Sequence, residues 1–128
     1  MSEKVYQAVG TTPGTEPYWD AAKEGKLLVK FCKDCGKPHY YPRGICPHCF
    51  STNLEWKQAK GTGEVYTYSI MNAGKPPYVI AYVTLDEGVS MMTNIVDVPF
   101  DQVKVGQKVK VVFKDMDNGG KLPCFTAV

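Results

Sequence analysis

Four cysteines in the first half of the chain carry the clearest chemical signal. They form two pairs, with two residues inside each pair and ten between the pairs: Cys32, Cys35, Cys46 and Cys49. Zinc favours four thiolates in a tetrahedron, and a tight turn with this spacing presents two sulfurs to one ion. The pattern predicts a bound Zn²⁺, with iron as the rival metal. Because four protein ligands leave no open coordination position, we expect a structural role rather than Lewis-acid catalysis.

The other residues that could do chemistry do not form a catalytic set. Cys124 stands alone in an apolar segment, where we expect a small buried residue. A cysteine nucleophile needs a histidine and an orienting acid, but His39 and His48 both lie in the cysteine module. We expect both histidines to be exposed polar residues rather than metal ligands. Asp86 and Glu87 precede a glycine and indicate a turn. No serine triad, P-loop, dinucleotide fingerprint or HExxH motif is present, so the sequence predicts no catalytic residue.

Length, composition and charge limit the class of protein. The 128 residues suit one domain with a small appendage. With 15 Lys and Arg against 13 Asp and Glu, the chain lacks the strong basic character of a duplex-DNA binder. Its apolar runs, about 4–8 residues long, are too short to span a membrane, and its first residues do not resemble a secretory signal. Close cysteine pairs in such a chain favour a metal site in a reducing compartment, so we expect a cytoplasmic protein.

The cysteine module needs support from its neighbours, because residues 32–50 have no hydrophobic period and cannot form a core. Residues 1–16 are polar and are expected to form an irregular arm. A short helix is expected over residues 17–25, where Pro17 suits the first turn and Gly25 the end. Residues 26–31 then indicate a strand that leads into the first cysteine.

After a junction near residues 51–60, the second half of the chain indicates β-structure. Short segments rich in β-forming residues are separated by glycine-containing turns and predict five strands: 65–70, 78–85, 89–96, 109–113 and 122–127. Strands at this spacing, with almost no helix, predict a mainly β protein that forms a small closed barrel or a sandwich.

Several motifs together resemble the DUF35 family. In the first half they are Phe31-Cys32-x2-Cys35-Gly36, Pro42-Arg43-x2-Cys46-Pro47-x-Cys49, Leu54-Glu55-Trp56 and Gly61-x-Gly63-x-Val65-Tyr66. In the second half they include Pro77-Tyr78-Val79-Ile80-Ala81, Leu85-Asp86-Glu87-Gly88, Asn94-Ile95-Val96-Asp97 and Leu122-Pro123-x-Phe125. The resemblance covers roughly residues 17–127. Phe50 departs from it, since the family usually has glycine after the second cysteine pair.

The resemblance implies an N-terminal helix and a rubredoxin-like zinc ribbon, followed by a C-terminal five-stranded OB-fold barrel. The corresponding divisions are an arm over 1–16, helix and lead-in strand over 17–30, zinc ribbon over 31–56 and OB-fold over 57–128.

The resemblance also implies a function. Members look like non-catalytic accessory subunits of thiolase-superfamily enzymes that act on acyl-CoA thioesters, as in benzoylsuccinyl-CoA cleavage during aromatic degradation or in steroid side-chain aldolases. The expected assembly is a heterotetramer with two copies of each chain, and the catalysis belongs to the partner. Because CoA carries several phosphates, the candidate contacts at the complex interface are three cations: Arg43, Lys57 and Lys60.

Two other functions remain open at this point. An OB barrel with a zinc ribbon is also a design for binding single-stranded nucleic acid, in which tyrosines stack on bases. Tyr66 and Tyr68 are expected to share one strand face, and Tyr78 and Tyr82 lie on the next strand. The low net charge weighs against nucleic acid, and packed or interface tyrosines are the simpler interpretation. A free-standing enzyme is the third possibility.

Overall fold

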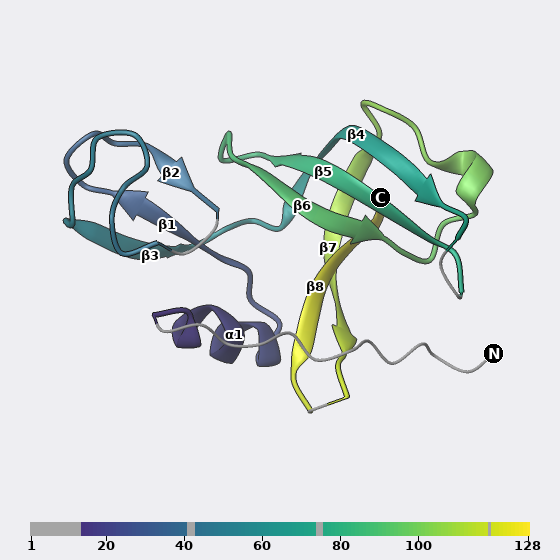
Figure 1. The fold of residues 1–128 in the computed structure, drawn as a ribbon, viewed down its shortest axis with the longest axis horizontal. Coiled ribbons are helices and arrows are strands. Elements are labelled where there is room, and N and C mark those ends of the chain that lie inside the picture. The colour runs from purple at the N-terminus through teal and green to yellow at the C-terminus, as the bar shows by residue number, and fades with distance from the viewer. Residues whose placement is uncertain (1–13, 41–42, 74–75, 118) are drawn as a thin grey trace.

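The computed structural model describes residues 14–40, 43–73, 76–117 and 119–128. In these residues one helix precedes eight strands and a single 3₁₀ turn. The elements are α1 (Glu16–Lys23), β1 (Leu28–Cys32), β2 (Pro38–His39), β3 (Leu54–Gln58), β4 (Thr62–Met71), β5 (Tyr78–Leu85), β6 (Ser90–Ile95), η1 (Phe100–Gln102), β7 (Lys108–Asp115) and β8 (Lys121–Ala127). Figure 1 shows a small sheet on one side and a barrel on the other, with α1 below them. No described helix has the length and apolarity that a bilayer crossing requires. The irregular arm expected over 1–16 lies almost wholly outside the described residues.

The cysteine module, residues 32–50, lies between β1 and β3 of the small sheet and includes β2. This sheet has the antiparallel order β2-β1-β3, and β1 pairs with β3 along its full length. Sequence reasoning predicted β1 but not β2 or β3, because neither of these strands shows a clear alternation of apolar and polar residues. Stacked cations help to hold β3 against β1: Lys30 lies 4.6 Å from the ring centroid of Trp56, and Lys57 lies 3.9 Å from that of Phe31.

The five strands of the second half form the closed barrel that the sequence predicts. The order is β4-β5-β6-β8-β7, and a parallel contact between β6 and β8 closes the barrel. Gly63 marks the point where β4 pairs with β5 and β7 at once, through Leu85 and Val109. A Cβ atom at Gly63 would lie 2.3 Å from the carbonyl oxygen of Thr84. Closure of the barrel at this point therefore needs a glycine.

A β-bulge in β4 changes which side chains face solvent. The pairing with β5 shifts between Val65 and Thr67, so Tyr66 is an extra residue in the strand. Tyr66 is 68% exposed, whereas Tyr68 packs against the core. The expectation that these two tyrosines share one face is wrong, because the bulge interrupts the alternation between them.

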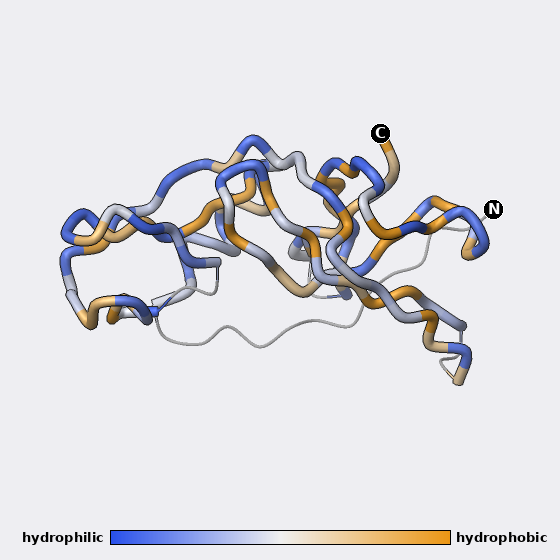
Figure 2. The backbone as a smooth tube through the Cα atoms, turned by 90° about the horizontal axis from the view of Figure 1, so that it is seen from above, coloured by the Kyte–Doolittle hydropathy of each residue, from blue (hydrophilic) through white to orange (hydrophobic). Residues whose placement is uncertain are grey.

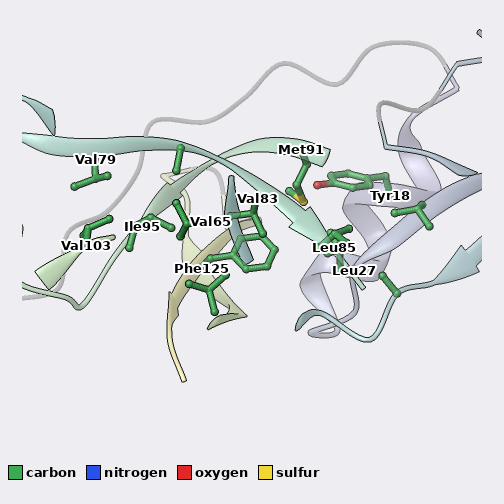
Figure 3. Packing of buried hydrophobic residues seen from close by; sticks show 14 residues of the cluster. Tyr18, Leu27, Val65, Val79, Val83, Leu85, Met91, Ile95, Val103 and Phe125 are labelled. Carbon is green, nitrogen blue, oxygen red and sulfur yellow. The ribbon is translucent and has the colours of Figure 1, made fainter. Parts of the chain in front are cut away.

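One hydrophobic core joins the barrel to the helix and the small sheet. Valines from three strands surround Phe125, which is fully buried. The same cluster includes Tyr18 of α1, together with Leu27 just before β1 and Val29 within it. In Figure 3 the Tyr18 ring points toward Met91 of β6. Along the barrel strands hydrophobic and hydrophilic residues alternate (Figure 2). The cysteine module is thus attached to a barrel that has its own core.

Replacement of Gly63 tests the close approach at the barrel seam. We expect Gly63→Ala to lower the free energy of unfolding by about 1–3 kcal/mol, because the new methyl group forces β4 away from β5. The measurement is urea unfolding followed by circular dichroism. Gly44→Ala is the control, because a Cβ at Gly44 meets nothing within 4 Å. Equal stability of the two variants would contradict this account of the seam.

Candidate metal centre and adjoining cleft

The two cysteine pairs lie in two turns with the same hydrogen-bond pattern. In the first turn the Gly36 N–H donates to the Cys32 carbonyl at 3.0 Å; in the second the Phe50 N–H donates to the Cys46 carbonyl at 2.9 Å. Each turn is closed by one more bond, from the first cysteine's N–H to the carbonyl five residues later. This repeated backbone geometry aims both pairs of sulfurs at a common point.

The four sulfurs are arranged as a tetrahedral metal ion requires. All of them lie within 4.8 Å of one another. The Sγ atoms of Cys32 and Cys49 are 3.5 Å apart, and those of Cys35 and Cys46 are 3.7 Å apart. A tetrahedron with Zn–S bonds of about 2.3 Å has S···S edges of about 3.8 Å. These sulfurs therefore fit one zinc-sized ion.

Electrostatics within the cluster also favour a cation. The backbone N–H of Cys35 contributes most to lowering the pKa of Cys32, which falls to about 7. At Cys49 the backbone N–H of Ser51 lowers the pKa, but desolvation and the neighbouring sulfurs outweigh it and raise the pKa to about 12. Several thiolates in so small a space repel one another, and a divalent cation removes that repulsion.

Phe50 occupies the position that glycine has in the first turn. Its φ is 65°, close to the 73° of Gly36, so the second turn keeps its geometry with a residue that is strained there. The Phe50 side chain is 79% exposed. The departure from the family pattern thus changes the surface of the turn and leaves its backbone hydrogen bonds intact.

The segment after the second pair is fastened to the first turn. The carboxylate of Asp34 accepts hydrogen bonds from the Ser51 hydroxyl and from the Asn53 side-chain amide. These bonds lower the pKa of Asp34, that from Ser51 most. The Lys33 N–H also donates to the Asn53 carbonyl at 2.9 Å. Residues 51–53 are therefore tied to the cysteine module by hydrogen bonds.

A cleft of about 980 Å³ separates the cysteine module from the barrel. The barrel wall is the hairpin of β5 and β6, with Tyr82, Met91 and Met92, and the opposite wall includes Lys37 and Arg43. Trp19 of α1 and Tyr40, which follows β2, also line the cleft. The Tyr18 and Tyr40 hydroxyls lie 2.7 Å apart and connect α1 to the module, while burial and the Tyr40 hydroxyl raise the pKa of Tyr18.

Two side chains on this cleft have buried polar atoms without a hydrogen bond. In the part of the chain that the structure describes, these atoms are both ring nitrogens of His39 and one carboxylate oxygen of Glu87. His39 is only 6% exposed, so the expectation of an exposed residue is wrong: the strand β2 turns its ring inward opposite Lys30. Desolvation lowers the pKa of His39 most; the charges of His48, Lys30 and Arg43 lower it further, and the backbone of Arg43 has a smaller opposing effect. His48 is exposed, as expected.

The three predicted CoA-contacting cations do not converge. Arg43 is exposed on the cleft; its motif neighbour Pro42 lies outside the described residues. Lys60 adjoins the cleft, since its N–H donates to Glu87 at 3.0 Å. Lys57 pairs with Val29 and stacks on Phe31, two residues that lie on one face of β1. Lys30, between them, lies on the other face, opposite His39. Lys57 therefore faces away from the cleft. Sequence reasoning missed Lys37, His39 and Glu87 as cleft residues, because their approach depends on tertiary packing.

Cys124 is fully buried in β8, as expected of a small hydrophobic residue. Both histidines lie in the cysteine module, outside the barrel. Among the described residues, the four clustered cysteines are the one place where three or more cysteine, histidine or acidic side chains converge. No described histidine or acid joins them, and Cys124 belongs to no such cluster.

Comparison with known families agrees with this architecture. The profile described as "ChsH2, rubredoxin-like zinc ribbon domain" matches residues 19–55, and "ChsH2, C-terminal OB-fold domain" matches residues 56–114. A "DUF35 domain-containing scaffold protein" of Methanocaldococcus jannaschii is 36% identical over 110 residues, which are 80% of this chain and 78% of the relative. A "Probable enoyl-CoA hydratase alpha subunit" of Thermomonospora curvata is 34% identical over 113 residues, which are 84% of this chain. The chain spans only 35% of the length of that relative.

Solved structures show the same arrangement of ribbon and barrel. A chain of the "Ltp2-ChsH2(DUF35) aldolase" superposes with a TM-score of 0.82 at 30% identity, over 94% of this chain and 98% of the other. A DUF35-family protein of unknown function from Sulfolobus solfataricus has a TM-score of 0.67 at 21% identity, over 92% of this chain and 87% of the other. The second likeness concerns the fold alone.

Removal of one sulfur tests the metal centre. We expect Cys46→Ser to reduce bound metal well below one ion per chain, because Cys46 is one of the four converging sulfurs. Loss of even a hydrogen bond to a metal ligand lowers metal affinity about 10–100-fold, and loss of a ligand should cost more. Elemental analysis of the purified chain measures the metal. The barrel retains its own core, so its β-sheet circular dichroism should persist. Cys124→Ala is the control and should keep the full metal content; native protein without stoichiometric zinc or iron would contradict the prediction.

Proposed function

Since this chain belongs to the DUF35 family, with a zinc ribbon followed by an OB-fold, we propose that it is a non-catalytic accessory subunit of an enzyme acting on acyl-CoA thioesters. The observation that carries the proposal is the joined ribbon and barrel with a large cleft between them. The catalytic nucleophile and base come from the partner chain. Relatives described as scaffold proteins, as a hydratase subunit and as part of an aldolase support this role.

The partner that we propose is a thiolase-superfamily enzyme, which forms or cleaves a carbon–carbon bond next to the thioester. One such reaction is the cleavage of benzoylsuccinyl-CoA in aromatic degradation. Two-fold symmetric enzyme dimers would carry one accessory chain on each half, giving a heterotetramer with two copies of each. A steroid side-chain aldolase is the second candidate partner, favoured by the likeness to the Ltp2-ChsH2 aldolase chain. We place the assembly in the cytoplasm, where thiolates stay reduced.

Zinc, in this proposal, is the structural metal that holds the ribbon. Its ligands are Cys32, Cys35, Cys46 and Cys49, and four thiolates leave no position for substrate. Metal binding takes the place of a hydrophobic core in a module of this kind. The ribbon thereby provides a rigid wall opposite the barrel hairpin.

The cleft is the proposed place for the acyl-CoA at the interface between the two subunits. Arg43 and Lys37 supply positive charge for CoA phosphates, and Lys60 adjoins the same opening. The unpaired atoms of His39 and Glu87 suit a ligand with both hydrogen-bond acceptors and donors. The amides of the pantetheine arm have both, and the methionines and aromatic rings of the cleft offer apolar contact. Lys57 remains a candidate only for a phosphate that passes outside the cleft.

Co-expression with a thiolase-superfamily enzyme from the same organism tests the accessory role. We expect the two chains to elute together in gel filtration at micromolar concentration, with the mass of two copies of each. The isolated chain should not turn over any acyl-CoA, because its described residues bring no cysteine, histidine and acid together outside the four-cysteine cluster. Separate elution would reject the complex, and turnover by the isolated chain that Cys124→Ala abolishes would reject the non-catalytic role.

Arg43→Ala tests the cleft. Loss of a charge-assisted bond to a phosphate costs about 1–3 kcal/mol, so we expect KM of the complex for its acyl-CoA to rise about 5- to 150-fold. Assembly should be unchanged. Lys104→Ala is the matched control, because Lys104 is an exposed cation in the connection between η1 and β7, outside the cleft. Unchanged KM and kcat for Arg43→Ala would remove Arg43 from the site while leaving the accessory role intact.

A further inference from the structure

The outer face of the hairpin strands lacks charged side chains. The outward positions of β4 after its bulge, of β5 and of β6 alternate with buried ones. They align across the three strands: Thr67, Ser69, Met71, Tyr78, Ile80, Tyr82, Thr84, Ser90, Met92 and Asn94. We call these ten residues the neutral face. Glu64, before the bulge, lies at its edge and pairs with Lys108 at 3.3 Å.

Large apolar side chains of the neutral face are exposed to solvent. Met92 is 55% exposed, Tyr82 is 47% exposed and Met71 is 37% exposed. Tyr66, which the bulge turns outward, adds a further exposed ring beside them. Tyrosine and methionine are enriched in protein interfaces, and charged residues are depleted at interface centres. The face has this composition in a chain of which 22% is charged.

Three polar side chains of the neutral face already have partners within the sheet. The hydroxyls of Thr84 and Ser90 lie 2.8 Å apart across β5 and β6. The side-chain amide of Asn94 donates to the Val79 carbonyl at 3.0 Å. A protein can cover these three groups without leaving them unpaired, so their share of the desolvation cost is low.

The composition of the neutral face favours a protein over a nucleic acid as its binding partner. In OB-folds the face of the second and third strands binds oligonucleotides, and here these strands are β5 and β6. Nucleic acid needs cations along its phosphates, but the neutral face has tyrosines without a lysine or arginine. A surface of this kind fits another apolar, uncharged protein surface.

We propose that the neutral face docks the enzyme subunit, through an apolar and uncharged patch of that enzyme. The proposal rests on the accessory role given above. Tyr82 and Met92 belong both to the face and to the wall of the cleft. An enzyme seated on the face therefore borders the cleft opening, where the two subunits can share one acyl-CoA. A second copy of this chain would instead bring two clefts together without a catalytic site.

A single charge placed on the face tests the proposal. We expect Met92→Lys to raise the Kd for the co-expressed thiolase-like enzyme at least tenfold, because the ammonium loses its water on docking. The Met92 side chain points outward, so the fold should be retained, as circular dichroism and thermal melting can verify. Ser69→Lys, at an exposed position of β4, provides a second variant with the same expected direction. Isothermal titration calorimetry measures each Kd.

Val105→Lys is the control, because Val105 is 66% exposed and lies between η1 and β7, outside the neutral face. Its Kd should stay within twofold of the unaltered chain. Unchanged binding by folded Met92→Lys and Ser69→Lys would overturn the proposal. The isolated chain could also self-associate, and both variants could abolish that self-association while enzyme binding stays intact. This result would assign the face to a second copy of the chain and would also overturn the proposal. If the unaltered chain fails to bind the enzyme at all, the accessory role fails first.

Discussion

Convergence of four sulfurs on one point is the constraint on which the ribbon depends. Residues 32–50 cannot bury enough apolar surface to fold by themselves, and the only described strand that lies wholly within them is the two-residue β2. Two turns with the same backbone bonds bring the thiols within 4.8 Å, where they repel one another as thiolates unless a cation is present. A bound metal and the backbone hydrogen bonds therefore stabilise the same geometry. The hydrogen bonds of Asp34 also join the first turn to the segment that follows the second.

The barrel is stabilised differently, because its strands form a hydrophobic core of their own. Phe125 and the surrounding valines need no metal, and Gly63 permits the close approach that seals the strands. The two parts meet where Tyr18, Leu27 and Val29 enter the barrel's hydrophobic cluster. This junction holds one wall of the cleft against the other.

Sequence reasoning succeeded where the signal was local. The cysteine spacing identified the cluster, and alternating apolar residues identified the five barrel strands to within a few residues. It failed where tertiary packing decided the outcome. The two-residue strand β2 has no period that could place His39 inside, and the β4 bulge is one extra residue that no local pattern marks. The cleft combines segments from α1, the ribbon and β5–β6, so its lining could not be read from any one of them.

Strand β1 connects the two parts with a backbone of fixed length. Val29 belongs to the barrel's cluster, and Cys32, three residues later, supplies a sulfur to the metal centre. Successive side chains of a strand point to opposite faces, so one inserted or deleted residue here would turn the sulfur away from its three partners. Loops elsewhere in this protein can lengthen during evolution at little cost. The interval between these two residues cannot, and a lineage that altered it would have to rebuild the metal centre and the cleft together.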